Sequence, residues 1–264
     1  MPTPIEIIVD PISLGIFMMY LVLIVWEFMY PATTLSASKH WKSRGLISFI
    51  CFFFLSSYLP LLWEDSLSQY QVLNLEEYNI LYSTLIGLFV YELAVYVWHR
   101  CLHQSSILWR WFHQMHHSAE RMDSYGAFWF SPMDMVGWTF LSSFCLTLIV
   151  GLPTQAVSNI ILLTTFFAIF QHSNIRTPQL LGYFIQRPES HSVHHATHTH
   201  YSNFSDLPIF DLIFGTFCNP KQATKQTGFY PGASLQVWQM MRGKDLQSAQ
   251  QTPANNSTYI QQGS

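Results

Sequence analysis

Residues 98–117 read WHRCLHQSSILWRWFHQMHH, and the histidines in this stretch recur at the intervals of a helix. They form an HxxxH pattern and then an HxxHH pattern: His99 and His103, followed by His113, His116 and His117. Side chains three or four residues apart lie on one face of a helix, with Cβ atoms about 5 to 6 Å apart. The stretch therefore predicts helices that each present neighbouring imidazole groups in one direction.

The HxxHH pattern occurs a second time, at His191, His194 and His195, and His172 lies between the two occurrences. Eleven of the 12 histidines fall within 99–200, so the enrichment is local. Imidazoles packed this closely beside lipid carry a substantial desolvation cost, which a shared metal ion offsets. We therefore expect these histidines to act together.

Nine histidines exceed the demand of one metal ion. A tetrahedral ion takes about four ligands and an octahedral ion six, less any open position. Two adjacent ions, each held by four or five imidazoles, fit the number. The predicted ligands are His99, His103, His113, His116, His117, His172, His191, His194 and His195. His198 and His200 are possible further ligands or outer groups.

The composition places this site at a membrane. Only 10% of the 264 residues are charged, against about 25% in a soluble domain. Half of the residues are hydrophobic, which argues against a soluble monomer. With 12 Lys and Arg and a net charge of -3, we expect no nucleic-acid partner. Four widely spaced cysteines indicate neither a disulfide framework nor a thiolate zinc site.

Long apolar runs predict an all-α fold, a polytopic membrane helical bundle with a cytosolic histidine-rich helical cap. The predicted spans are residues 12–29, 46–63 and 80–98, with a hairpin over 136–170 that either crosses fully or dips into the bilayer. The predicted cap comprises residues 99–131 and 171–217. We expect a single membrane-embedded domain over residues 1–243 and a disordered polar tail over 244–264.

Charges between the spans predict the orientation. The segment 31–45 holds Lys39, Lys42 and Arg44, whereas the segment 64–79 holds four acids and no Lys or Arg. Basic residues stay on the cytoplasmic side, so the N-terminus is expected outside and both histidine-rich stretches in the cytoplasm.

The three histidine patterns resemble the histidine boxes of the fatty acid hydroxylase and sterol desaturase superfamily of membrane proteins. A further match is the Gln-His-x-Asn element at Gln171, His172 and Asn174. The family's closing pattern of Asn-Tyr, Trp-Asp and Leu-Phe-Gly-Thr appears here, with Phe in place of the Tyr and the Trp, as Asn203-Phe204, Phe210-Asp211 and Ile213-Phe214-Gly215-Thr216. The resemblance runs from about residue 91 to residue 217, and three boxes in order with spans between them make it specific. Some relatives carry a further histidine where this chain has Arg176, which leaves the ligand count of the second metal open.

This resemblance implies an oxidoreductase with two iron ions, for which zinc could substitute. Such a protein uses dioxygen to hydroxylate or desaturate a lipid from the bilayer, such as an acyl chain or a sterol. The chain carries no GxGxxG, P-loop or CxxCH motif, so a separate electron donor of ferredoxin or cytochrome b5 type is expected. The expected location is a bacterial inner membrane, or the endoplasmic reticulum membrane in a eukaryote.

Two other classes stay open at this point. A noncatalytic membrane protein with a structural pair of zinc ions would use the same histidines in closed sites, and a metal transporter would place its ligands inside the spans. Neither GxSxG nor HExxH occurs, which argues against a hydrolase. Acids expected to orient the ligands are Glu92, Asp123, Asp134, Asp206 and Asp211. Glu92, two helical turns before His99 on the same face, is expected either to accept the ring N–H of a ligand or to be an acid inside the membrane that pairs with a neighbour.

Overall fold

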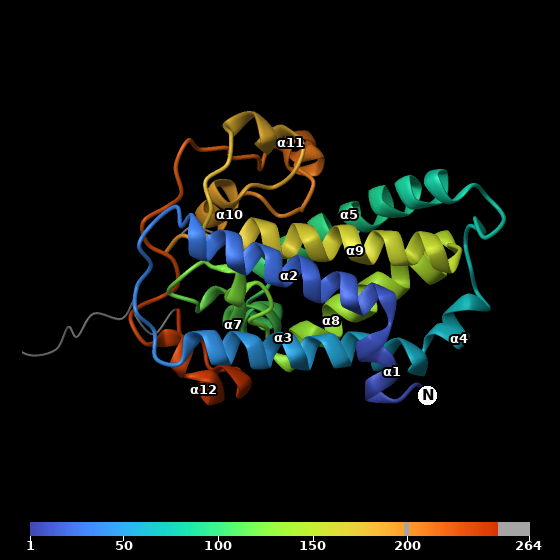
Figure 1. Ribbon diagram of the computed structural model, residues 1–264, viewed down its shortest axis with the longest axis horizontal. Coiled ribbons are helices and arrows are strands. Elements are labelled where there is room, and N and C mark those ends of the chain that lie inside the picture. The colour runs from blue at the N-terminus through green and yellow to red at the C-terminus, as the bar shows by residue number, and fades with distance from the viewer. Residues whose placement is uncertain (198–200, 248–264) are drawn as a thin grey trace, which may run out of the picture.

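A computed structural model describes residues 1–197 and 201–247, and every named element in these residues is helical (Figure 1). The long helices are α2 (Pro11–Met29), α3 (Trp41–Tyr58) with its continuation η1 (Leu59–Leu62), α5 (Ile80–Gln104), α8 (Pro132–Ser143) with its continuation η4 (Phe144–Val150), and α9 (Thr154–His172). Shorter elements are α1 (Pro4–Val9), α4 (Glu64–Ser68), α6 (Ser106–Leu108), η2 (Trp109–His113), α7 (Gln114–His117), η3 (Ser124–Gly126), η5 (Gln179–Tyr183), α10 (Pro188–His194), α11 (Ile209–Phe214), η6 (Ala233–Leu235) and α12 (Val237–Met241).

Helix starts follow local capping chemistry. The Asp10 side chain accepts the Ile12 N–H at 2.9 Å at the start of α2, and the Asn79 side chain accepts the Leu81 N–H at 2.9 Å at the start of α5. Ser131 caps α8 in the same way, with a proline at the first helical position. Each cap satisfies a backbone donor that the helix itself leaves unpaired.

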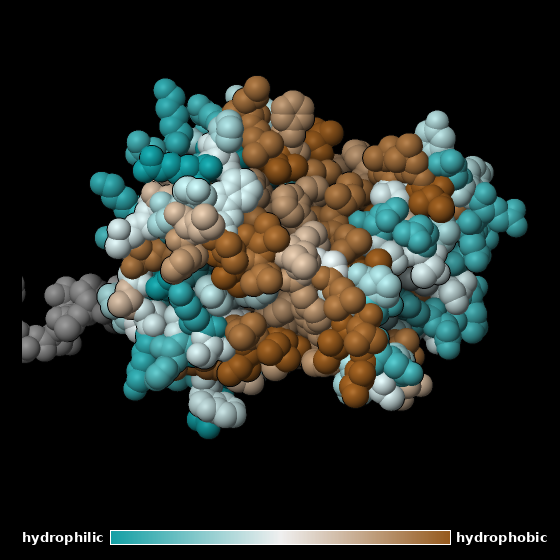
Figure 2. Space-filling model, viewed as in Figure 1, coloured by the Kyte–Doolittle hydropathy of each residue, from teal (hydrophilic) through white to brown (hydrophobic). Residues whose placement is uncertain are grey.

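Five helical segments within the described residues are long and apolar enough to cross a membrane. Figure 2 shows apolar side chains across the middle of one face and hydrophilic side chains towards both ends. Large apolar residues such as Leu21, Phe28 and Tyr82 are exposed along these helices. An exposed apolar band between two polar ends fits a bundle surrounded by lipid.

The observed segments differ from the predicted spans mainly at their ends. The second begins at Trp41 rather than residue 46, because Lys42 and Arg44 interrupt the apolar run without ending the helix. Arg44 lies over the rings of Trp41 and Trp129, at 5.5 and 5.2 Å from the centroids. The hairpin is longer than predicted, with two 19-residue segments joined at Gly151, whose φ is 63°.

Folded structure also continues past the predicted boundary at residue 243. Leu246 is buried against a cluster that includes Trp41, Trp109 and Met115, and its N–H donates to Gln114 Oε1 at 3.3 Å. One apolar residue in a polar segment suffices for this anchoring because it fills an existing apolar cluster. The remainder of the predicted tail, 248–264, and the possible ligands His198 and His200 lie outside the described residues.

The histidine-rich elements gather at one end of the bundle. In Figure 1, α7, α10 and α12 lie at this end, and α1 and α4 lie at the other. We call these the histidine end and the far end. The alternation of the long helices thus brings both histidine-rich stretches together.

Candidate metal centre

Helix geometry delivers the nine predicted ligands to one place. α5 continues beyond the predicted span and carries the first box, α7 carries the end of the second, and α10 carries most of the third. His113 ends η2, a π-helical turn. Such a turn widens the helix and is frequent at functional sites. His172 is the last residue of α9, and His195 follows α10 directly.

The structure sorts these side chains into two groups, and in each group the candidate ligand atoms all lie within 4.8 Å of one another. The five-histidine group is His99, His103, His113, His117 and His194, and the four-histidine group is His116, His172, His191 and His195. The groups adjoin, since the rings of His117 and His195 stack at 4.1 Å between centroids. Arg176, in place of the further histidine of some relatives, is exposed and donates to Ala32 O at 3.4 Å.

Backbone carbonyls fix which ring nitrogen of several histidines faces its group. His99 Nδ1 lies 2.8 Å from Phe204 O, and His172 Nδ1 lies 2.7 Å from Ala168 O. His194 Nδ1 lies 2.8 Å from Ser202 O. A carbonyl only accepts, so each Nδ1 must donate, and in a neutral imidazole Nε2 then keeps a lone pair.

This arrangement fits metal ions better than it fits hydrogen bonds among the rings. His113 Nδ1 lies 3.0 Å from Asp134 Oδ2, and its Nε2 lies 2.9 Å from His99 Nε2. With both Nδ1 atoms donating outward, two lone pairs face each other and need a cation between them. Adjacent ligands at right angles, with metal–nitrogen bonds of about 2.1 Å, would stand about 3.0 Å apart.

The four-histidine group shows the same geometry. His172 Nε2 lies 3.1 Å from His116 Nε2 and 3.2 Å from His191 Nε2, and His191 Nε2 lies 3.2 Å from His195 Nε2. The one lone pair of His172 Nε2 can accept only one of these neighbours as a hydrogen-bond donor. The residues of each group therefore fit one metal ion held by imidazole, and the two groups together fit a pair of ions.

Burial keeps three of the candidate ligands in the neutral form, which is the form that can bind a metal ion. Loss of solvent, followed by the proximity of the other histidines, holds the pKa of His116, His191 and His195 well below its usual range. The metal-free site is thus ready to bind without first releasing protons from these three rings.

Of the five acids expected to orient ligands, Asp134 contacts a candidate ligand directly, namely His113. The expectation that Glu92 accepts the ring N–H of a ligand is wrong: its Oε2 accepts the N–H groups of Asp206 and Leu207, at 3.1 and 3.0 Å. Seven residues return to the same helix face, but they also rise about 10.5 Å along the axis, which is beyond the reach of a glutamate.

The other three acids do not touch the ligands in the contacts described. Asp123 accepts from Trp41 Nε1 at 2.8 Å and from Arg121 Nε at 2.6 Å. Asp206 accepts from Gln171 Nε2 at 2.8 Å. Asp211 acts one step away, because it accepts the Phe204 N–H at 2.9 Å and so holds the peptide segment whose carbonyl receives His99.

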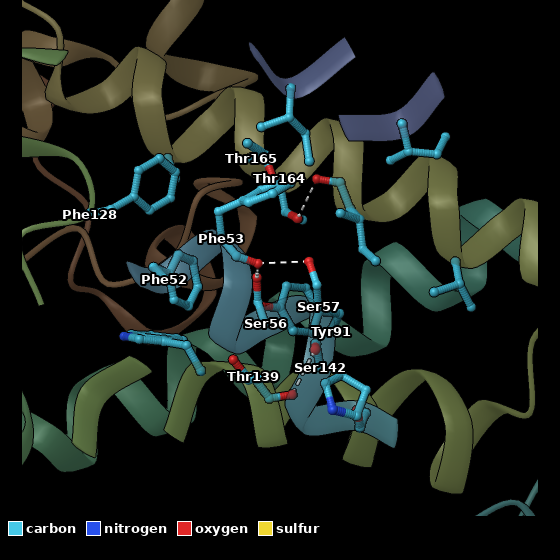
Figure 3. Close-up of a pocket in the computed structure, with 18 of the residues that line it drawn as sticks. Phe52, Phe53, Ser56, Ser57, Tyr91, Phe128, Thr139, Ser142, Thr164 and Thr165 are labelled. Carbon is cyan, nitrogen blue, oxygen red and sulfur yellow. Dashed lines mark hydrogen bonds between the residues drawn. The ribbon is translucent and has the colours of Figure 1, made fainter. Parts of the chain in front are cut away.

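A cavity of about 640 Å³ extends from the metal centre through the bundle. At the histidine end it is lined by His99, His113, His116, His172 and His191, together with Phe128 and Phe130. Its middle is lined by Ser and Thr side chains from α3, α8 and α9, several of which are drawn in Figure 3. Space for a long ligand therefore leads directly to the candidate ligands of both groups.

Comparison with known proteins agrees with this geometry. The family model for fatty acid hydroxylases matches residues 84–216, half of the chain. The chain belongs to the fatty acid hydroxylase family. It is similar to ornithine lipid hydroxylase OlsE of Rhizobium tropici, with 30% identity over 152 residues that cover 55% of this chain and 44% of that protein. The chain thus spans less than half the length of this relative, and no solved structure matches it.

The fatty acid hydroxylase match contains all nine candidate ligands, whereas α1, α2, α3 and α12 lie outside it. Residues of α1, α2 and α3 nevertheless line the cavity. The family region thus supplies the histidine groups, and elements outside it help to shape the space that leads to them.

Sequence reasoning missed the carbonyls of Phe204, Ala168 and Ser202, because every residue has a carbonyl and composition cannot single one out. One available signal was the family's closing pattern. Asn203 adopts a φ of 62° and donates from Nδ2 to Ser190 O at 2.7 Å, which fixes the loop between Ser202 and Phe204 beside α10.

Proposed function

We propose that this protein is a membrane-bound oxidoreductase that uses dioxygen and two non-haem iron ions to hydroxylate a lipid. The observation that supports this most is the pair of imidazole groups at the end of a long cavity. When bound there, a pair of iron ions would supply dioxygen activation and the oxidation of an unactivated C–H bond. A lipid of the surrounding bilayer is the proposed substrate, and hydroxylation of a lipid is also what the name of the Rhizobium relative describes.

The residues of the chain position and protect this chemistry. Phe128 and Phe130 line the cavity beside His116 and keep water away from the reacting end. Asp134 and the Phe204 carbonyl hold the rings of His113 and His99 in one orientation. The substrate chain therefore meets fixed ligands in a dry environment.

The proposal includes a separate electron donor and a cytoplasmic histidine end. Lys39, Lys42 and Arg44 lie in or beside the connection between α2 and α3 at that end, and the acids of 64–79 lie at the far end. This distribution follows the preference of basic residues for the cytoplasmic side. A ferredoxin or a cytochrome b5 type protein would then reach the metal centre from the cytoplasm.

Isotope labelling tests the proposed reaction. Membranes that contain the wild-type protein, the donor and ¹⁸O-labelled dioxygen should yield a lipid with one labelled hydroxyl. His116→Ala should abolish this product, whereas His40→Asn, which removes a histidine that belongs to neither group, should retain it. Identical lipid profiles for wild type and His116→Ala would reject the proposal.

A further inference from the structure

The cavity has one open and one closed end. Its exposed lining residues are Pro2, Glu6, Asp10 and Ile161, all in the half of the bundle away from the histidines. The histidines that line the opposite end are buried. A ligand from lipid or from the membrane surface therefore has its way in at the far end.

The path between the two ends is long. Along α9, lining residues run from Val157 to His172, and a rise over 15 residues of helix spans about 22 Å. At the far end, the carboxylates of Glu6 and Asp10 offer polar surroundings. At the histidine end, Phe128, Phe130 and Val95 add apolar surface. Gln171 and Asp206 also line this end, but Gln171 Nε2 donates to Asp206 Oδ1 at 2.8 Å, so these two polar groups are paired with each other. The polarity of the cavity thus matches an amphiphile whose polar group stays at the far end.

The walls are suited to an apolar chain despite their hydroxyl groups. Ser57 Oγ donates to Phe53 O at 2.7 Å (Figure 3). Thr139 Oγ1 donates to Met135 O at 2.8 Å, and Thr164 Oγ1 donates to Ile160 O at 2.9 Å. Each hydroxyl hydrogen is used within its own helix, so these side chains present no free donor to the cavity. Their small size leaves room for the cavity between the helices.

We infer that the lipid chain enters tail first from the far end, so that its methyl end lies at the metal centre and its head group stays near α1. This inference rests on the proposed function for the reaction, but the binding orientation can be measured without turnover. It predicts that oxidation falls on the distal part of the chain, at a position set by the distance from the methyl end.

Photo-crosslinking tests the orientation directly. Two long-chain monoacylglycerol probes are compared on the purified full-length protein, one with a diazirine at the methyl end and one with a diazirine beside the glycerol. We expect the methyl-end probe to label the segment around Phe128 and Phe130, and the glycerol-end probe to label the segment 2–10. The reverse pattern, or equal labelling of both segments by each probe, would overturn the inference. So would labelling that excess unmodified monoacylglycerol does not suppress.

A matched pair of variants gives a second test. Thr164→Phe places a large ring in the cavity between the open end and the histidines, whereas Leu163→Phe adds the same ring at a neighbouring residue that is outside the cavity lining and exposed. We expect Thr164→Phe to reduce labelling near Phe128 at least tenfold for both short and long chains, and Leu163→Phe to change it little. Undiminished labelling near Phe128 in Thr164→Phe would show that the chain does not pass this residue, and that result would overturn the inference.

Product analysis separates the orientation from the reaction. For acyl chains of increasing length, the hydroxyl should stay at a constant distance from the methyl end, and a constant distance from the head group would overturn the inference. If no chain is oxidised while the methyl-end probe still labels Phe128, the proposed function fails and the orientation stands.

Discussion

His172 shows how the chain orients one candidate ligand. Its Nδ1 donates to Ala168 O, one turn earlier in α9, so its Nε2 lone pair faces His116 and His191. The residue's own helix thereby fixes the tautomer, without help from a distant side chain. Its position as the last residue of α9 places the ring at the closed end of the cavity.

Removal of this ring should empty one group and spare the other. We expect His172→Ala to lower the metal bound per chain to about half, because the four-histidine group loses a ligand and the five-histidine group keeps its full set. Elemental analysis of the purified protein measures this ratio. His40→Asn is the matched control, since Asn also tolerates the positive φ of 52° at this position. An unchanged metal content in His172→Ala would contradict the assignment.

We expect the stability of the folded protein to depend on pH through the buried carboxyl group of Asp206. Burial raises the pKa of Asp206 from 3.8 to about 7, against the lowering effect of Gln171. The folded state thus favours the protonated form of Asp206. Above pH 7 the group is a carboxylate, and its burial lowers the free energy of unfolding by the full amount. This loss of stability disappears as the pH falls towards the pKa that Asp206 has in the unfolded chain. Asp206→Asn removes the charge and keeps an acceptor for Gln171.

The variant should therefore gain thermal stability over wild type at pH 8 and lose most of that gain at pH 5. Unfolding of the metal-free proteins in detergent at both pH values measures the difference. If wild type and Asp206→Asn differ in stability by the same amount at pH 8 and at pH 5, the Asp206 carboxyl group has the same pKa in the folded and unfolded chains, and the prediction is wrong.

At the scale of elements, Gly45 sets how closely α3 approaches η3. A Cβ at this position would overlap the carbonyl oxygen of Tyr125, which is backbone and cannot rotate away. By contrast, a Cβ at Gly15 would meet only the end of the Leu162 side chain, at 3.3 Å. Glycine at residue 45 therefore permits a backbone contact just after the second histidine box.

We expect Gly45→Ala to destabilise the protein by about 1–3 kcal/mol and to lower its unfolding temperature by several degrees. Gly15→Ala, a similar change in another long helix, should have a smaller effect because a leucine side chain can adjust. Thermal unfolding in detergent compares the two variants. Equal effects would mean that the contact with Tyr125 gives way easily.

Hydropathy predicted the helices well, because lipid-facing positions exclude most polar residues. It failed where charge is tolerated, as at Lys42 and Arg44 near the start of α3. Histidine spacing predicted which residues gather, since i, i+3 and i+4 positions share a helix face. It could not assign them to two groups, because the division depends on how α5, α7 and α10 pack. The error at Glu92 arose because a shared face says nothing about distance along the axis.

At the scale of the whole molecule, the two ends of the bundle should lie on opposite sides of the membrane. In a background with the native cysteines replaced by serine, a membrane-impermeant maleimide should label Ser68→Cys on intact cells. Lys225→Cys should react only after permeabilisation, because we propose that the histidine end is cytoplasmic. Both substituted residues are exposed in the structure. Labelling of Lys225→Cys on intact cells would reverse the proposed orientation.

Both histidine groups draw ligands from before the α8–α9 hairpin and from α10 or the residue that follows it. During synthesis, neither group is complete until the translocon has inserted that hairpin and the third box has left the ribosome. Loading of the proposed ions can therefore be completed only after the hairpin is inserted and the third box has emerged. Chains made while the metal is scarce would wait in the bilayer, empty but inserted, and become competent when supply returns, without new translation.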